Sequence, residues 1–193
     1  MEKFIVIIIS YLLGAIPFAY IITRTFKGVD IREMGSGNVG TTNALRTAGK
    51  RAALAALTGD LLKGFAAAWL GMHFGGVGLA AICSVAAVIG HCWPVFLSFE
   101  GGKGAATSAG VILYLMPKVI VVLIIVFILI IVLSRYVSLA SISVAVLLPV
   151  VAIVFAEPRS YLIMSIILMI LVVYKHRENI ERLRNGNERK IGS

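Results

Sequence analysis

The stretch KVIVVLIIVFILIIVLS, residues 118–134, is apolar from its second residue to the one before its last. Its only charged residue is Lys118, at the first position. A helix needs about 20 apolar residues to cross the hydrocarbon core of a bilayer, which is roughly 30 Å thick. The stretch is close to that length and therefore predicts a membrane-spanning helix.

Further apolar segments lie at approximately 4–23, 52–72, 77–97, 105–117, 137–156 and 160–174. The segment 105–117 is short and carries Thr107, Ser108 and Gly110. We expect it to be a half-helix, a re-entrant segment or a span completed by neighbouring loop residues. The sequence thus predicts an all-α polytopic membrane protein of about seven short transmembrane helices, forming a single domain over residues 1–193.

Composition supports a membrane protein. Apolar residues make up 60% of the chain and charged residues only 14%, against roughly 25% charged in an average soluble domain. The net charge of +9 in so apolar a chain indicates basic loops and attraction to anionic lipids or substrates, and argues against a nucleic-acid partner. Cys83 and Cys92 lack metal-ligand spacing and are expected to be packed, reduced thiols.

The basic residues are distributed unevenly between the two sets of connecting segments. If the spans alternate, 24–51, 98–104, 135–136 and 175–193 lie on one side and hold 14 of the 18 Lys and Arg residues. The other side holds three, and Lys63 lies inside a span. Cytoplasmic loops carry such an excess, so the N-terminus is expected outside and the C-terminus inside. No small-x-small cleavage site ends the first apolar run, which is expected to be retained as a span.

The segment GSGNVGTTNALR, residues 35–46, follows the first predicted span. Its G-x-G-x-x-G pattern is not a dinucleotide fingerprint, because no strand precedes it. Glycines still allow backbone N–H groups to converge on an anion, and a following helix N-terminus favours negative charge. We expect Arg46 to bind a phosphate with two hydrogen bonds; the alternative is a flexible turn beside the membrane. The other predicted substrate contacts here are Ser36, Gly37, Asn38, Gly40, Thr41, Thr42 and Asn43.

A second polar cluster comprises GHCWP, residues 90–94, and FEGGKGAAT, residues 99–107. It is not a Walker A loop, which requires Ser or Thr directly after the lysine. Lys103 is expected to contact a second phosphate, with Gly101, Gly102 and Gly104 allowing close approach of the backbone. The alternative is a lysine that snorkels at the membrane boundary. His91 is expected to be a hydrogen-bonded residue at a helix end.

Two charged residues lie within the second predicted span. Asp60 and Lys63 are three residues apart, so they share a helix face and are expected to pair. Charges inside a membrane are costly and are functional by default, and we expect this pair to brace the site from behind the substrate contacts.

The basic C-terminal segment forms a third cluster, KHRENIERL at 175–183. A continued helix would place His176 and Asn179 one turn apart and would pair Glu178 with Arg182 and Glu181 with Arg177. Glu178 and Glu181 are therefore expected to support the site, and the alternative is a solvated helix end. Ser141 belongs to a fourth polar group on the same predicted face.

The motifs GSGNVGTTNALRTAG at 35–49, GHCWPVFLSFEGGKGAAT at 90–107 and KHRENIERL at 175–183 resemble those of the PlsY family. These are bacterial membrane acyl-phosphate:glycerol-3-phosphate acyltransferases. The resemblance covers nearly the whole chain. It implies a multi-pass protein of the bacterial inner membrane whose motifs face the cytoplasm. It also implies transfer of a fatty acyl group to glycerol 3-phosphate, giving lysophosphatidic acid and phosphate in the first acylation of phospholipid synthesis.

The residues fit that chemistry. Both substrates are anions, and phosphate is a good leaving group, so positioning and electrostatic stabilisation can supply most of the catalysis. We expect no cofactor, no metal and no acyl-CoA, and a monomer whose partners are glycerol 3-phosphate, fatty acyl phosphate and membrane lipids. The general base is either His176 or a substrate phosphate. The expected catalytic residues are Ser36, Arg46, Lys103, His176 and Asn179.

Two other function classes are compatible with parts of this pattern. A transporter for organic anions also uses broken helices and basic residues, but the chain has no convincing internal repeat and its polar groups crowd one face. A CDP-alcohol phosphotransferase needs several intramembrane aspartates for metal, whereas Asp30 and Asp60 are the only aspartates in the chain.

Overall fold

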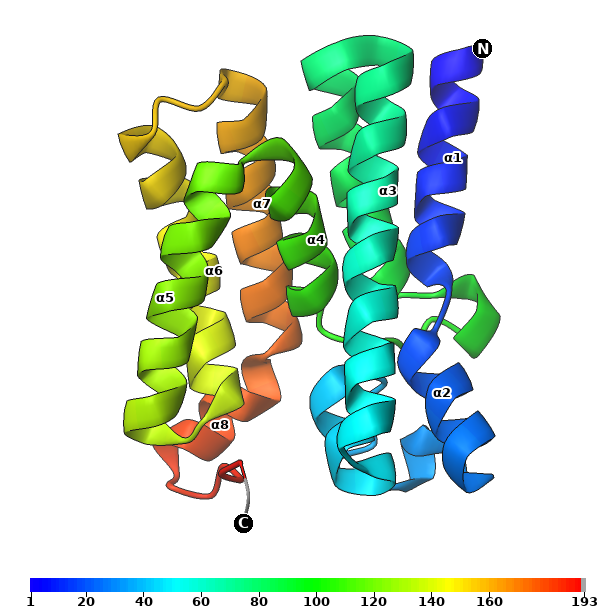
Figure 1. The fold of residues 1–193 in the computed structure, drawn as a ribbon, viewed down its shortest axis with the longest axis vertical. Helices are drawn as coiled ribbons and strands as arrows, with labels where there is room; N and C mark the ends of the chain where they lie inside the picture. The colour runs from blue at the N-terminus through cyan, green and yellow to red at the C-terminus, as the bar shows by residue number, and fades with distance from the viewer. Residues whose placement is uncertain (192–193) are drawn as a thin grey trace.

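The computed structural model describes residues 1–191 as a bundle of α-helices (Figure 1). The elements are α1 (Glu2–Ala15), α2 (Phe18–Lys27), the 3-10 turn η1 (Ile31–Glu33), α3 (Thr41–Cys92), the 3-10 turn η2 (Val95–Leu97), α4 (Ala105–Leu115), α5 (Pro117–Ser134), α6 (Val137–Val154), α7 (Arg159–Lys175) and α8 (Arg177–Arg184). The all-α membrane fold predicted from the sequence is confirmed.

Helix α3 folds back on itself. Its backbone leaves the helical conformation at Gly75 and Gly76, and Gly76 has a φ of 66°, which glycine adopts without steric cost. The two arms then run side by side, so that a Cβ added to Gly71 would lie 2.6 Å from the Cα of Ala80. Figure 1 shows this reversal at the end of the molecule where the N-terminus lies. The predicted spans 52–72 and 77–97 correspond to these arms.

Judged by length and composition, four helical segments of residues 1–191 are long and apolar enough to cross a membrane. The number is five if α7 and α8, which meet at 59°, form one span. One of the four, Thr41–Leu97, contains the α3 reversal and so supplies two passes. With α4, which has only 11 residues, the arrangement agrees with about seven short helices.

Two predicted helices are broken in the structure. The span 4–23 is interrupted between α1 and α2, where Ile16 is extended and Pro17 removes a backbone donor. The C-terminal helix does not continue straight through His176, because the chain bends by 59° there. Both breaks bring polar residues to the same region of the bundle.

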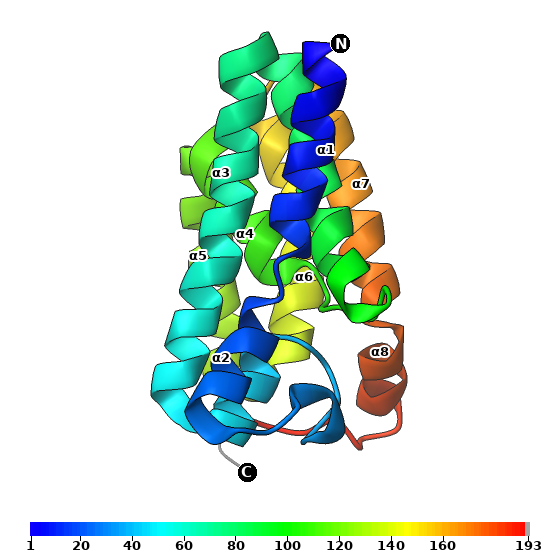
Figure 2. The same ribbon diagram turned by 90° about the vertical axis from the view of Figure 1, so that its right-hand side faces the viewer.

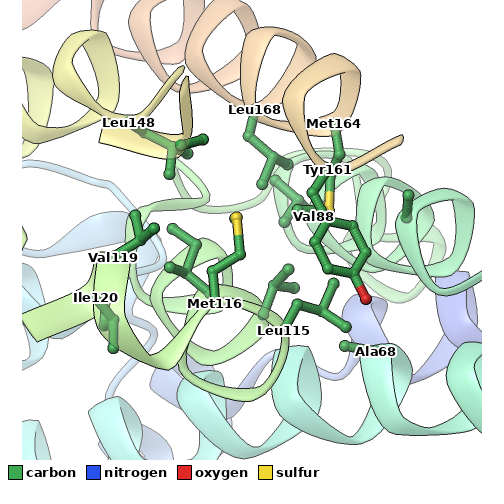
Figure 3. Packing of buried hydrophobic residues seen from close by; sticks show 14 of the residues in the cluster. Ala68, Val88, Leu115, Met116, Val119, Ile120, Leu148, Tyr161, Met164 and Leu168 are labelled. Atoms are coloured by element: carbon green, nitrogen blue, oxygen red, sulfur yellow. The ribbon is translucent and has the colours of Figure 1, made fainter. Parts of the chain in front are cut away.

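The main apolar core packs α4 against both arms of α3 and against α5, α6 and α7. Figure 3 shows Leu115, Met116 and Val119 facing Leu148, Leu168 and Met164. Met116 and Val119 are fully buried. This core holds the C-terminal half of α4 in place.

The polar loops gather toward one end of the bundle. In Figures 1 and 2, α2 and α8 lie at the end opposite the N-terminus, and the loop that leads into α4 lies near mid-height. The short helix α4 is therefore a half-helix beside longer neighbours, one of the possibilities expected for 105–117. Its N-terminus opens into the interior of the bundle.

Close helix packing at Gly110 provides a test of this fold. A Cβ built on Gly110 would collide with the backbone oxygen of Leu61 on α3, whereas one built on Gly78 would meet no atom of residues 1–191 within 4 Å. Gly110→Ala should therefore cost about 1–3 kcal/mol of stability through overpacking, and Gly78→Ala should cost little. Thermal unfolding midpoints in detergent would measure both. Equal midpoints for the two variants would contradict the α3–α4 contact.

Candidate functional site

A cavity of about 750 Å³ lies between α3, α4, α5, α6 and the C-terminal segment. One end is polar and is lined by residues from each of the predicted motifs, among them Ser36, Arg46, Lys103 and His176. The other end is apolar and runs between the helices. A single cavity therefore joins a charged region to a hydrophobic channel.

The glycine-rich loop is shaped by the buried side chain of Asn43. Its Oδ1 accepts a hydrogen bond of 3.0 Å from the N–H of Ser36. Its Nδ2 lies 3.0, 2.9 and 3.1 Å from the carbonyl oxygens of Ile31, Met34 and Asn38. Because these backbone groups bind both ends of the amide, Asn43 holds the loop in shape, and its role as a direct substrate contact stays a prediction.

Helix α3 begins directly after the loop, as expected. Thr41 is its first residue and lines the cavity, and its buried hydroxyl has no hydrogen-bond partner among residues 1–191. Arg46 lies just over one turn further on and lines the same cavity. Within residues 1–191 its guanidinium makes one long hydrogen bond, 3.4 Å to the carbonyl of Arg189. Most of its hydrogen-bonding capacity thus remains available to an anion.

Lys103 projects from the loop before α4 and donates a hydrogen bond to Oδ1 of Asn179 on α8. Burial lowers the pKa of Lys103 to about 8, because the surrounding protein disfavours its charged form. In the part of the chain that the structure describes, no carboxylate lies within ion-pair distance of Lys103. A bound anion would supply the missing negative charge.

A buried ionic cluster lies behind the Lys103 loop. Asp60 and Lys63 pair at 2.8 Å, as their spacing predicts, and Nδ1 of His91 lies 3.4 Å from the same Asp60 oxygen. The carbonyl of His91 accepts a 3.0 Å hydrogen bond from the N–H of Gly102. A Cβ on Gly102 would collide with the His91 ring, so the loop packs directly against it. His91 is thus a hydrogen-bonded residue at the end of α3.

His176, at the α7–α8 bend, and Asn179, on α8, both line the cavity. Nδ1 of His176 lies 2.8 Å from the carbonyl oxygen of Val172. A carbonyl can only accept, so this contact requires the proton on Nδ1 and leaves Nε2 of the neutral ring as an acceptor. The ring is buried, with 5% of its surface exposed, and is therefore held in one orientation.

Glu188 is a site residue that the sequence pattern did not indicate. Its carboxylate accepts hydrogen bonds from Ser138 at 2.8 Å, Asn179 at 2.6 Å and Arg182 at 2.8 Å. Burial alone would raise the pKa of Glu188, but these hydrogen bonds outweigh burial and lower it. The carboxylate is therefore charged and orients Asn179. No motif or periodic pattern in the sequence distinguishes it from the other polar residues of the C-terminal tail.

The chain matches the family described as glycerol-3-phosphate acyltransferase over residues 4–186. A glycerol-3-phosphate acyltransferase of Syntrophomonas wolfei is 54% identical over 191 residues, which cover 99% of this chain and 98% of that protein. One from Rubrobacter xylanophilus is 40% identical, with 100% of this chain and 96% of that protein covered. The chain belongs to the glycerol-3-phosphate acyltransferase family.

Solved structures support the same assignment. The crystal structure of PlsY (YgiH), an integral membrane glycerol 3-phosphate acyltransferase, in its glycerol 3-phosphate form matches with a TM-score of 0.95 and 39% identity. The lysophosphatidic acid form matches with a TM-score of 0.93 and 39% identity. Each comparison covers 100% of this chain and 96% of that chain. The PlsY-family resemblance seen in the three motifs is confirmed.

Most of the residues predicted for the acyltransferase site meet at the cavity. Those that line it are Ser36, Asn38, Gly40, Thr41, Thr42, Asn43, Arg46, Asp60, His91, Lys103, Gly104, Ser141, His176 and Asn179. Gly101, Gly102 and Lys63 lie behind it, around a small internal void. Gly37 is close to this region but does not line the cavity, and it adopts a φ of 69°, which favours glycine.

Two predicted supporting residues do not lie at the site. Glu178 and Glu181 are on the exposed face of α8, because the bend at His176 turns that face outward. Glu178 lies 3.9 Å from Arg182, so only the first of the two predicted pairs forms in the described residues. Glu188 provides the buried carboxylate in their place.

The apolar end of the cavity lies among helices of this membrane acyltransferase. Leu61 of α3, Ile112 of α4, Leu123 of α5 and Leu148 of α6 line it. Ile124 of α5 also lines it and is 47% exposed. This end is therefore walled by apolar side chains from four helices, a surface that suits a hydrocarbon chain.

Proposed function

We propose that this protein transfers a fatty acyl group from acyl phosphate to the 1-hydroxyl of glycerol 3-phosphate. The products are lysophosphatidic acid and phosphate. The observation that carries the proposal is the single cavity whose polar end holds Arg46 and Lys103 and whose apolar end opens between membrane helices. Membership of the glycerol-3-phosphate acyltransferase family agrees with it.

The polar end has enough donors for two phosphates. Arg46, Lys103 and Ser36 are assigned to the phosphates, together with backbone N–H groups at the start of α3 and α4. Eight further loop residues shape or contribute to this end. They are Gly37, Asn38, Gly40, Thr41, Thr42, Gly101, Gly102 and Gly104. Asp60, Lys63 and His91 hold the Lys103 loop from behind.

His176 and Asn179 orient the glycerol end, with Ser141 beside them on α6. The attacking hydroxyl donates a hydrogen bond to Nε2 of His176, whose other nitrogen is held by Val172. The proton of this hydroxyl then passes to His176 or to a substrate phosphate. Positioning supplies much of the rate, because two anions are held side by side in a partly dry cavity.

The choice of acyl donor can be measured directly. Purified protein with radiolabelled glycerol 3-phosphate should form lysophosphatidic acid from acyl phosphate and should remain active in excess EDTA. The reason is that among residues 1–191 no group of three or more His, Cys, Asp or Glu side chains is arranged to hold a metal. Comparable turnover with acyl-CoA, or loss of activity on chelation, would sink this assignment.

Steady-state kinetics of four variants test the phosphate contacts. Arg46→Ala and Lys103→Ala should each lose roughly 10- to 100-fold in kcat/KM, since each removes a charge-assisted hydrogen bond. Arg46→Lys should also be poor, because an ammonium cannot reproduce a planar two-pronged contact.

Arg184→Ala is the matched control, because Arg184 is exposed at the end of α8 and does not line the cavity. It should retain most activity. Elution as a homogeneous species in size-exclusion chromatography would establish that each variant folds. Near-normal kcat/KM in both Arg46→Ala and Lys103→Ala would mean that the phosphates bind elsewhere.

We further propose a single-domain monomer in the bacterial inner membrane, with the N-terminus outside and the cavity's polar end facing the cytoplasm. Cysteines introduced at the exposed positions Lys27, Arg51 and Asn185 should be protected from an impermeant maleimide in intact cells. A cysteine at Lys118, on the opposite side, should react. Labelling of any of the first three in intact cells would refute the orientation.

A further inference from the structure

Ser108 differs from the other buried serines in the helices of this protein. The hydroxyls of Ser10, Ser84 and Ser165 each donate to the carbonyl four residues earlier, at 2.8, 2.7 and 2.7 Å. Ser108 lies on α4 with only 6% of its surface exposed, and its hydroxyl has no hydrogen-bond partner among residues 1–191. It lines the large cavity. A buried hydroxyl without a partner is costly unless a ligand supplies one.

The N-terminus of α4 forms the same stretch of cavity wall. Gly104 precedes the helix with a φ of 83°, and the first bond of the helix runs from the N–H of Ser108 to the Gly104 carbonyl at 2.8 Å. The N–H groups of Ala105 and Ala106 therefore precede the first bonded turn and have no partner within the helix. Ala105 and Ala106 line the cavity beside Ser108. Hydroxyl and amides together form a cluster of donors at the positive end of a helix.

The position of this cluster indicates which part of a ligand it would meet. Lys103 lies immediately before it, at the polar end, and Ile112 lies one turn beyond Ser108, in the apolar channel. An acyl phosphate with its phosphate at Lys103 and its chain in the channel must place its carbonyl group between these two points. That is the level of Ser108.

We propose that the Ser108 hydroxyl, with the free amides at the start of α4, binds the acyl carbonyl oxygen and stabilises the negative charge that develops on it. The inference rests on the proposed function. The glycerol oxygen attacks the carbonyl carbon and forms a new C–O bond, while the carbonyl π electrons move to the oxygen that Ser108 holds. The electrons then return, the bond to the phosphate oxygen breaks, and phosphate leaves with that pair. The proton of the glycerol hydroxyl passes to His176 or to a substrate phosphate.

Removing the hydroxyl should affect the chemical step more than binding. Ser108→Ala should lower kcat roughly 10- to 100-fold, because loss of one such donor typically costs about 100- to 1000-fold and the helix amides remain. KM for glycerol 3-phosphate should change less than about threefold. The affinity for a non-transferable acyl phosphonate, measured by its inhibition constant, should also stay within about threefold. Ser108→Thr, which retains a hydroxyl, should recover part of kcat.

Ser165→Ala is the matched control, since Ser165 is equally buried in a helix but bonds to its own backbone and does not line the cavity. It should leave kcat near the wild-type value. If Ser108→Ala does not yield folded protein, Ser108→Cys keeps the shape of the side chain, is only slightly larger and replaces the hydroxyl by a weak donor, so it should show a similar fall in kcat.

Three results would overturn the role of Ser108. They are a normal kcat in the alanine or cysteine variant, a loss confined to the affinity for the acyl phosphonate, and an equal loss in Ser165→Ala. Wild-type protein that makes no lysophosphatidic acid from acyl phosphate would instead overturn the proposed function, and Ser108's role with it. The wild-type assay thus separates the two failures.

Discussion

The structure depends on satisfying backbone carbonyls where helices stop inside the bundle. In the hydrocarbon region no water can hydrogen-bond to these carbonyls, so donors from the protein must do so. Lys63 donates to the carbonyl of Ile16 at the α1–α2 break, at 2.9 Å. Lys175 donates to the carbonyl of Cys92 at the end of α3, at 3.0 Å. Each cation lies at a helix C-terminus, where the aligned peptide dipoles favour positive charge.

These contacts also determine where the site can form. The charge of Lys63 is balanced by Asp60, and Asp60 in turn lies beside His91. The His91 carbonyl then holds Gly102, the residue before Lys103. Loss of one partner would leave an uncompensated buried charge, which costs more than the pair contributes. The position of Lys103 is therefore fixed through α3 and does not depend on the flexibility of its glycine-rich loop.

The sequence was most informative where a single physical rule decides the structure. Bilayer thickness determines the length of a spanning helix, and three-residue spacing places Asp60 and Lys63 on one face. The sequence was less informative where contacts between distant segments decide the structure. The side chain of Asn43 is of a type that often contacts ligands. Only the folded structure shows that backbone groups of the loop hydrogen-bond to its amide. Glu188 lies in a polar tail without periodicity, and the bend at His176 is what brings the tail back over the cavity.

The charges that line the cavity explain why it would take up anions. Among residues 1–191, Asp60 is matched by Lys63 and Glu188 by Arg182, while Arg46 and Lys103 have no carboxylate within ion-pair distance. Burial, together with the nearby charge of Arg182, lowers the pKa of Lys103 to about 8, because no carboxylate in the described part of the chain pairs with it to offset these effects. Lys103 hydrogen-bonds to the neutral side-chain amide of Asn179. Exchange of this partner for a phosphate would therefore leave no unpaired negative charge behind. With a pKa of about 8 Lys103 is still mostly protonated at neutral pH, and a nearby anion would favour its charged form further.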